Sequence, residues 1–132
     1  MLKVEKNLAP RSGLMKYKFP HRLRLTTDDQ FKKVFRSARK IPTELYAVFY
    51  CNNSLTHPRL GIVAPKKSIR KANERNSFKR AVRESFRLRQ HKLNAIDIIF
   101  LAYKKAESAS KEKLCQHLEQ QWEELILRQK KL

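Results

Sequence analysis

Apolar residues recur along the chain with two periodicities, which together predict an alternation of helices and strands. Spacings of three and four residues favour helices over residues 27–37, about 70–89 and about 110–129. Short runs rich in aromatic and β-branched residues favour strands over residues 45–51, 59–64 and 97–102. The order helix, strands, helix, strand, helix predicts an α+β fold, in which helices cover a sheet.

Local signals set several boundaries. Thr27 and Gln30 have the spacing of a capping box, so the first helix should begin at Thr27. Pro42 marks a break, and Pro65 ends the ladder of the second strand. Residues 1–24 mix Lys, Arg, Pro and Gly with few periodic apolar positions, which is typical of an irregular basic arm. We therefore expect one domain over residues 25–132, preceded by this arm.

Met15 is an alternative start of the chain. Residues 1–14 would then be a disordered extension of the arm.

The helix predicted near residues 70–89 has two unlike faces. At roughly 100° per residue, one arc collects polar and cationic side chains: Asn76, Lys79, Arg80, Arg83 and Arg87. The opposite side is mostly apolar: Phe78, Ala81, Val82, Ser85 and Phe86. The arc has almost no compensating acid, since Glu84 lies to its side. The charge continues upstream through Lys66, Lys67, Arg70 and Lys71. Such a helix, docked by its apolar face, is a platform for a polyanion.

Composition strengthens this interpretation. The 132 residues include 31 Lys and Arg against 12 Asp and Glu, a net charge of +19. Nucleic acid is the usual partner of such a charge, although RNA and DNA are not separable on charge alone. An anionic membrane surface is the competing partner, but the chain has no long apolar segment or lipidation signal. We expect a cytoplasmic protein, because no stretch has the length of a signal peptide core or a membrane span.

Residues able to carry catalysis are scattered. Cys51 and Cys115 form neither a disulfide framework nor a zinc pattern. The four histidines lack spacing partners: His21, His57, His91 and His117. We therefore expect no catalytic residue, no metal ligand and no small-molecule substrate, and any chemistry should be carried by another molecule.

Aromatic residues form a second feature. Phe31 and Phe35 lie one helical turn apart, near a predicted strand that contains Tyr46, Phe49 and Tyr50. Alternation places Tyr46 and Tyr50 on one face of this strand and Phe49 on the other. One set must pack inward, whereas the other could line an open groove in which unpaired bases stack. From the residues alone, a core role is favoured for this cluster.

The segment from residue 74 to 86 resembles the signature of the bacterial ribonuclease P protein component family. This signature has an Arg-Asn-Arg core, then Lys-Arg, then Arg-Glu or Arg-Gln and an aromatic residue. Residues 19–25, 29–35, 57–61, 66–67 and 87–91 fit the family as well, so the resemblance covers about residues 16–129. Ser77 departs from the family, which usually has its second Arg there, and Pro65 replaces a small residue. By helical geometry, Ser77 lies at the rim of the basic arc.

The resemblance implies a two-layer α/β sandwich with the order αβββαβα. An additional strand would fall near residues 37–43. The family also has a left-handed βαβ crossover around the basic helix, against the usual right-handed rule.

The resemblance also implies a function. The family's protein is a subunit of a ribonucleoprotein endoribonuclease that removes the 5′ leader of precursor tRNA by hydrolysing a phosphodiester. The catalytic RNA performs this chemistry with Mg²⁺, which is bound chiefly by the RNA. The implied RNA-binding residues are Lys66, Lys67, Arg70, Arg75, Asn76, Lys79, Arg80, Arg83 and Arg87. The implied leader groove contains Phe31 and Phe35, joined by some of Tyr46, Phe49 and Tyr50 according to strand register. The alternative is a non-catalytic RNA-binding module, such as a ribosomal or RNA-chaperone protein.

Overall fold

A computed structural model describes residues 21–132 of the chain. Its helices and strands are α1 (Asp28–Ser37), β1 (Arg39–Pro42), β2 (Tyr46–Asn52), β3 (Arg59–Val63), α2 (Ala72–Arg89), β4 (Ile96–Ala102) and α3 (Lys111–Arg128). Short 3-10 turns are η2 (His21–Leu23), η3 (Gln90–Lys92), η4 (Lys104–Ser108) and η5 (Gln129–Lys131). The order αβββαβα is confirmed, including the strand that only the family resemblance implied. Each element predicted from periodicity is confirmed with small shifts of its ends.

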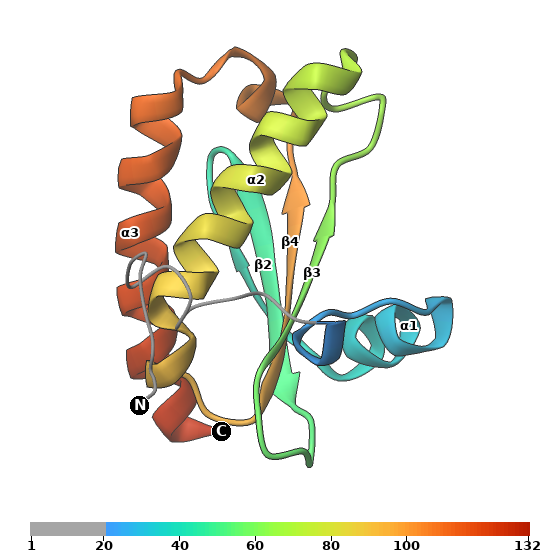
Figure 1. Ribbon diagram of the computed structural model, residues 1–132, viewed down its shortest axis with the longest axis vertical. Coiled ribbons are helices and arrows are strands. Elements are labelled where there is room, and N and C mark those ends of the chain that lie inside the picture. The colour runs from blue at the N-terminus through green and yellow to red at the C-terminus, as the bar shows by residue number, and fades with distance from the viewer. Residues whose placement is uncertain (1–20) are drawn as a thin grey trace, which may run out of the picture.

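The four strands form one mixed sheet in the order β1-β2-β4-β3. β2 pairs antiparallel with β1 and with β4, whereas β3 and β4 are parallel and are joined by α2. In Figure 1, β3 and β4 both point up, α2 lies in front of the sheet, and β4 lies to the left of β3. This crossover is left-handed, the opposite of the usual hand of a parallel βαβ unit, as the resemblance implied.

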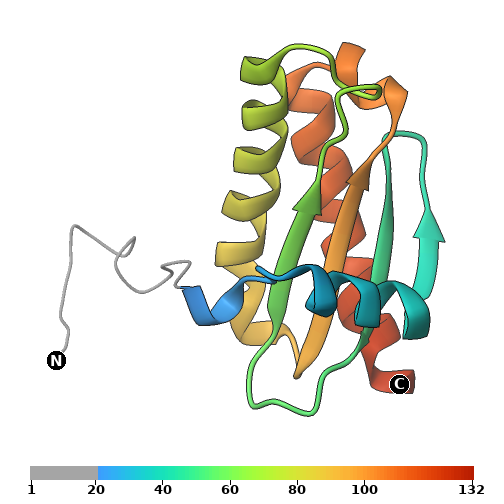
Figure 2. The same cartoon turned by 90° about the vertical axis from the view of Figure 1, so that its right-hand side faces the viewer.

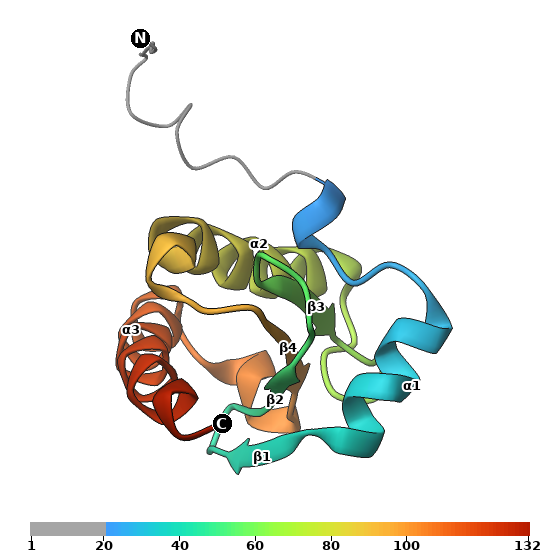
Figure 3. The same ribbon diagram turned by 90° about the horizontal axis from the view of Figure 1, so that it is seen from below.

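The main core lies between the sheet and the two long helices, which cover the same face (Figure 3). α2 contributes Phe78, Val82 and Phe86, and α3 contributes Leu118, Trp122 and Leu125. The indole Nε1 of Trp122 donates a hydrogen bond of 2.7 Å to Ser85 Oγ. This bond satisfies the polar atom of a fully buried ring and links α3 to α2.

Tyr46 and Tyr50 belong to this core, with 0% and 1% of their surface exposed. The Tyr46 hydroxyl lies 3.0 Å from His117 Nδ1, and burial raises its pKa. Alternation along β2 turns both tyrosines toward α2 and α3 and leaves Phe49 on the other face. The expectation that Tyr46 and Tyr50 line an RNA groove is therefore wrong, because a buried ring cannot stack on a base.

α1 lies across the opposite face of the sheet (Figure 2), where a small cluster is built on Leu25, Val34 and Ile99. Its capping box is confirmed: Gln30 N–H donates to Thr27 Oγ1, and Thr27 N–H donates to Gln30 Oε1, both at 3.2 Å. Figure 2 shows that α1 crosses only one end of the sheet. The remainder of that face carries no covering helix among the described residues.

Residues 21–24 belong to the folded domain. Leu23 and Leu25 are buried, and Arg24 forms an isolated parallel bridge with Leu60 of β3. The Leu25 N–H donates to the Leu60 carbonyl at 2.9 Å. The predicted boundary between residues 24 and 25 is therefore wrong. The rest of the predicted arm, including Met15 and residues 1–14, lies outside the described residues.

Candidate RNA-binding site

The amphipathic character of α2 is confirmed. Phe78, Val82 and Phe86 are buried, whereas Asn76 and Arg80 are exposed. Lys79, Arg83 and Arg87 are half-buried at the flanks of the helix. Ser77 is exposed, so the residue at the family's usual Arg position lies in solvent. The outward face thus presents cations and amides, and the flanks lie against neighbouring elements.

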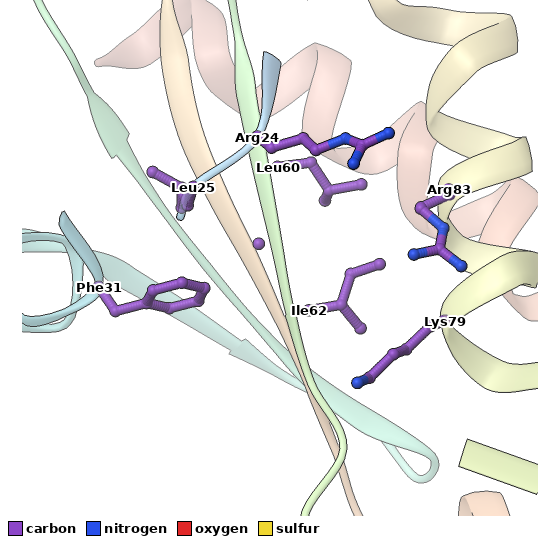
Figure 4. Close-up of a pocket in the computed structure, with 8 residues that line it drawn as sticks. Arg24, Leu25, Phe31, Leu60, Ile62, Lys79 and Arg83 are labelled. Carbon is purple, nitrogen blue, oxygen red and sulfur yellow. The ribbon is translucent and has the colours of Figure 1, made fainter. Parts of the chain in front are cut away.

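A pocket of about 170 Å³ lies between α2, β3 and the segment that enters α1. Its lining residues are Arg24, Leu25, Phe31, Leu60, Gly61, Ile62, Lys79 and Arg83. Figure 4 shows Phe31 on one side and the side chains of Lys79 and Arg83 extending from α2 on the other. The pocket thus combines one candidate from the aromatic set with two from the basic helix. A half-buried aromatic ring beside three cations matches a nucleotide, which has an apolar base and an anionic phosphate.

Arg24 is the lining cation that the sequence did not predict, because residues 1–24 have the composition of an irregular basic arm. A signal was present: the cation lies between Leu23 and Leu25, and this alternation of period two is typical of an extended segment against a sheet. The segment is too short for the pattern to be distinguished from chance.

Gly61 makes room for the Phe31 ring. A Cβ atom at position 61 would lie 2.6 Å from Phe31 Cε1 and 2.8 Å from Cζ. It would also lie 3.1 Å from Leu25 Cδ1. The ring therefore rests directly on the backbone of β3, and the depth of the pocket depends on a residue without a side chain.

Phe35 and Phe49 form an aromatic pair on the face of the sheet that also carries Phe31. Their ring centroids lie 4.9 Å apart in an edge-to-face arrangement at 79°. Phe35 is 41% exposed, and Lys40 Nζ lies 5.7 Å from the centroid of the Phe49 ring. The strand register therefore assigns Phe49, and neither tyrosine, to the face that carries Phe31 and Phe35.

The segment that forms the pocket wall is held at two points. Besides the bond from Leu25 to Leu60, His57 Nε2 lies 3.0 Å from the Arg22 carbonyl. A carbonyl only accepts, so Nε2 is the donor and carries the proton. Asn53 Nδ2 fixes the loop that carries His57, since it donates to the His57 carbonyl at 3.0 Å and to Asp97 Oδ1 at 2.9 Å. His57 is thus a structural contact of the wall.

The loop before α2 presents three exposed cations, Lys66, Lys67 and Arg70. Arg75 holds this loop, because its Nη1 donates to the carbonyls of Ile69 and Arg70 at 3.0 and 2.9 Å. Arg70 N–H donates to Glu107 Oε2 at 2.7 Å, and Lys104 Nζ donates to Oε1 at 2.9 Å. These bonds, the backbone N–H first, lower the pKa of Glu107 to about 2.

Three predicted RNA-binding arginines have intramolecular partners. Arg70 Nε lies 3.3 Å from Glu107 Oε2, Arg75 bonds the loop before α2, and Arg87 forms an ion pair of 2.6 Å with Glu84. Their guanidinium groups are thus partly engaged by the protein.

Two kinds of site are absent from residues 21–132. No three His, Cys, Asp or Glu side chains in this range form a group that could hold a metal ion. No helix in the same range is long and apolar enough to cross a membrane.

Comparison with known proteins points to one family. The family model of ribonuclease P matches residues 19–126. The chain is 43% identical over 111 residues to the ribonuclease P protein component of Aliivibrio fischeri, covering 84% of this chain and 95% of that protein. It is 44% identical over 110 residues to that of Photobacterium profundum, covering 83% and 93%.

Solved structures of RNase P proteins have a similar fold. The RNase P protein of Staphylococcus aureus superposes with a TM-score of 0.71 at 30% identity, covering 74% of this chain and 90% of that one. The RNase P protein of Thermotoga maritima superposes with a TM-score of 0.61 at 30% identity, covering 74% and 96%. On its sequence, its left-handed crossover and these matches, the chain belongs to the ribonuclease P protein family.

Proposed function

We propose that this chain is the protein component of ribonuclease P and binds both the catalytic RNA and the 5′ leader of precursor tRNA. The observation that carries the proposal is one pocket that Phe31, Lys79 and Arg83 line together, with the ring on one side of β3 and the two cations on the other (Figure 4). It joins an aromatic surface to cations, as single-stranded RNA requires. The relatives are named as ribonuclease P protein components, which favours this function over a ribosomal or RNA-chaperone module.

The leader is proposed to lie over the outer face of the sheet. Bases stack on the aromatic rings of Phe31, Phe35 and Phe49, largely without sequence preference, because every base has a π-face. Lys79 and Arg83 neutralise the adjoining phosphates. Mature tRNA lacks the leader, so these contacts favour the precursor over the product.

The catalytic RNA is proposed to bind the outward face of α2 and the loop before it. Lys66, Lys67, Arg70, Asn76 and Arg80 are exposed there. The cations lower the repulsion between two RNAs, and the Asn76 amide can both donate to and accept from bases or hydroxyls. Arg75 and Arg87 stabilise this surface through their intramolecular bonds. Their remaining N–H groups can donate to the RNA.

The chemistry is proposed to reside in the RNA. Mg²⁺ prefers clustered carboxylate oxygens and phosphates, and residues 21–132 hold no cluster of acidic or histidine side chains that fits the ion. We therefore propose that the catalytic RNA binds the Mg²⁺ that phosphodiester hydrolysis requires. The protein contributes binding and charge neutralisation.

The test compares precursor and mature tRNA on the holoenzyme. Phe31→Ala and Phe35→Ala should each weaken precursor binding roughly 5- to 150-fold, the value of one base stack, and leave mature tRNA unchanged. Leu127→Ala is the matched control, because Leu127 is an apolar side chain that is 64% exposed on α3, away from the site.

Two results would contradict the proposal. Equal losses for precursor and mature tRNA would mean that the rings are scaffold. Cleavage of precursor by the protein alone, with no RNA subunit present, would place the chemistry in the protein.

Sequencing of the RNA that co-purifies with the chain should show one dominant structured RNA and precursor tRNA. Ribosomal RNA instead would support the alternative module.

A further inference from the structure

The loop that joins β3 to α2 has a defined shape and carries exposed cations. Lys66 and Lys67 are exposed on it, and neither forms an ion pair within the part of the chain that the structure describes. Ile69, by contrast, is only 1% exposed and anchors the loop in the main core. The N–H groups of Ser68 and Ile69 both donate to the Pro65 carbonyl at 3.0 Å. The two lysines therefore lie on a tight turn.

Glu107 reaches this loop from a distant part of the chain. It lies on η4, at the upper end of the molecule in Figure 1, where α2 also begins. Its Oε2 accepts the backbone N–H of Arg70 at 2.7 Å, and Arg70 Nε lies 3.3 Å from the same oxygen. Lys104 Nζ donates to Oε1 at 2.9 Å. The carboxylate is thus fixed on η4 by one neighbour and holds the backbone of the loop with its other oxygen.

A carboxylate at this place supplies what α2 lacks at its own beginning. The N-cap residue of α2, Lys71, makes no side-chain capping hydrogen bond. The beginning of a helix carries a partial positive charge, so a nearby carboxylate is stabilising. The pKa of Glu107, about 2, keeps this carboxylate ionised near neutral pH. Because Arg70 directly precedes the N-cap, Glu107 fixes the path by which the chain enters α2.

Glu74 offers a comparison within the same pocket. Glu74 and Glu107 line a pocket of about 420 Å³ together with Arg70 and Lys71. Glu74 is in the first turn of α2 and forms no ion pair within the part of the chain that the structure describes. Removal of either acid adds one positive charge at the same place, and charge alone should then make RNA bind more tightly. Of the two acids, Glu107 is the one that bonds the loop.

We propose that Glu107 is a positioning residue for the catalytic RNA: it holds the loop before α2 so that Lys66 and Lys67 meet phosphates. This inference rests on the proposed function, in which that loop binds the catalytic RNA. The carboxylate itself repels phosphate, so its contribution to RNA binding is made through the backbone of Arg70. The sign of the effect therefore separates positioning from charge.

The experiment measures the affinity of the full chain for the catalytic RNA at several salt concentrations. Glu107→Ala should weaken binding roughly 2- to 30-fold, the value of two exposed ion pairs, and should lower the salt slope by up to about two. Glu107→Gln should recover part of this affinity, because its amide oxygen still accepts the Arg70 N–H. The matched control, Glu74→Ala, should bind as tightly as the original chain or more tightly.

A second measurement tests whether Glu107 acts through the lysines. In the Lys66→Ala, Lys67→Ala background, Glu107→Ala should cost no further affinity, because the groups that it positions are gone. An equal loss in both backgrounds would overturn the inference and assign Glu107 a general role in stability. Tighter binding by Glu107→Ala would overturn it too, since only charge would then matter.

Failure of the proposed function gives a different result. The Lys66→Ala, Lys67→Ala variant would then bind the catalytic RNA as tightly as the original chain, which would remove the inference as well. If the inference alone is wrong, this double variant loses affinity but Glu107→Ala binds no more weakly than Glu74→Ala. Circular dichroism of each variant at the temperature of the binding measurement checks that it is folded.

Discussion

At the scale of single residues, the groove depends on Gly61 as much as on the aromatic side chains. The Phe31 ring occupies the space in which any other residue would carry its Cβ atom. Interiors are packed closely, so a methyl group at 2.6 Å from a ring carbon forces the ring or the strand to move. The sequence identified Phe31 as a candidate, but its position depends on a residue 30 positions away.

Gly61→Ala should therefore displace the Phe31 ring. We expect the free energy of unfolding to fall by about 1–3 kcal/mol, as for other overpacked sites, and precursor binding to weaken while mature tRNA binding is unchanged. Urea unfolding and tRNA affinity measure the two effects. Combining Gly61→Ala with Phe31→Leu should cost less stability than the sum of the single changes, because the smaller side chain relieves the clash. Strict additivity would show that the two residues do not compete for this space.

At the scale of secondary structure, α1 is the element that carries two of the aromatic rings, Phe31 and Phe35. Its beginning is fixed locally by the capping box of Thr27 and Gln30. It buries only Val34 completely, so little packing compensates for a weakened first turn. The capping box that predicts this helix from the sequence is thus also an interaction that stabilises it.

Thr27→Ala should remove the side-chain acceptor for the Gln30 N–H. We expect a loss of about 1 kcal/mol in the free energy of unfolding, together with weaker precursor binding, because Phe31 and Phe35 follow within two turns. Thr26→Ala is the matched control: its backbone N–H bond to Gln30 remains, and its hydroxyl only approaches Gln30 Oε1 at 3.5 Å. Equal destabilisation by both substitutions would show that the cap contributes nothing specific.

At the scale of the whole molecule, charge is distributed unevenly. Cations line the pocket, α2 and the loop before it, whereas α3 carries four of the twelve acids of the chain: Glu112, Glu119, Glu123 and Glu124. Long-range attraction therefore favours approach of RNA from the α2 side. The salt dependence of binding reports how many of these cations meet phosphates.

Arg83→Ala should weaken binding of precursor, whose leader phosphates Arg83 is proposed to neutralise, and should reduce the salt slope of that binding by about one, the value for one phosphate contact. The control is Arg128→Ala on α3, where the arginine is paired with Glu124 at 2.7 Å. Arg128→Ala should leave the slope unchanged. An unchanged slope for Arg83→Ala would mean that Arg83 contacts no phosphate.

Local patterns account for what the sequence by itself determined. The capping box, the apolar face of α2 and the buried runs of β2, β3 and β4 lie within short stretches, so neighbouring residues suffice to predict them. Such patterns did not predict β1, because Ile41 is its only buried residue. The net charge of +19 likewise indicated a nucleic-acid partner without any structure.

Tertiary structure alone decided how these elements form a site. Alternation divides β2 into two faces, but only the packing of α2 and α3 shows that Tyr46 and Tyr50 face inward and Phe49 outward. The strand order β1-β2-β4-β3 and the left-handed crossover bring Lys79 and Phe31 to one pocket. These contacts join residues far apart in the chain, and no local preference specifies them. Their physical cause is the burial of apolar side chains on both faces of the sheet, in the main core under α2 and α3 and in the smaller cluster under α1.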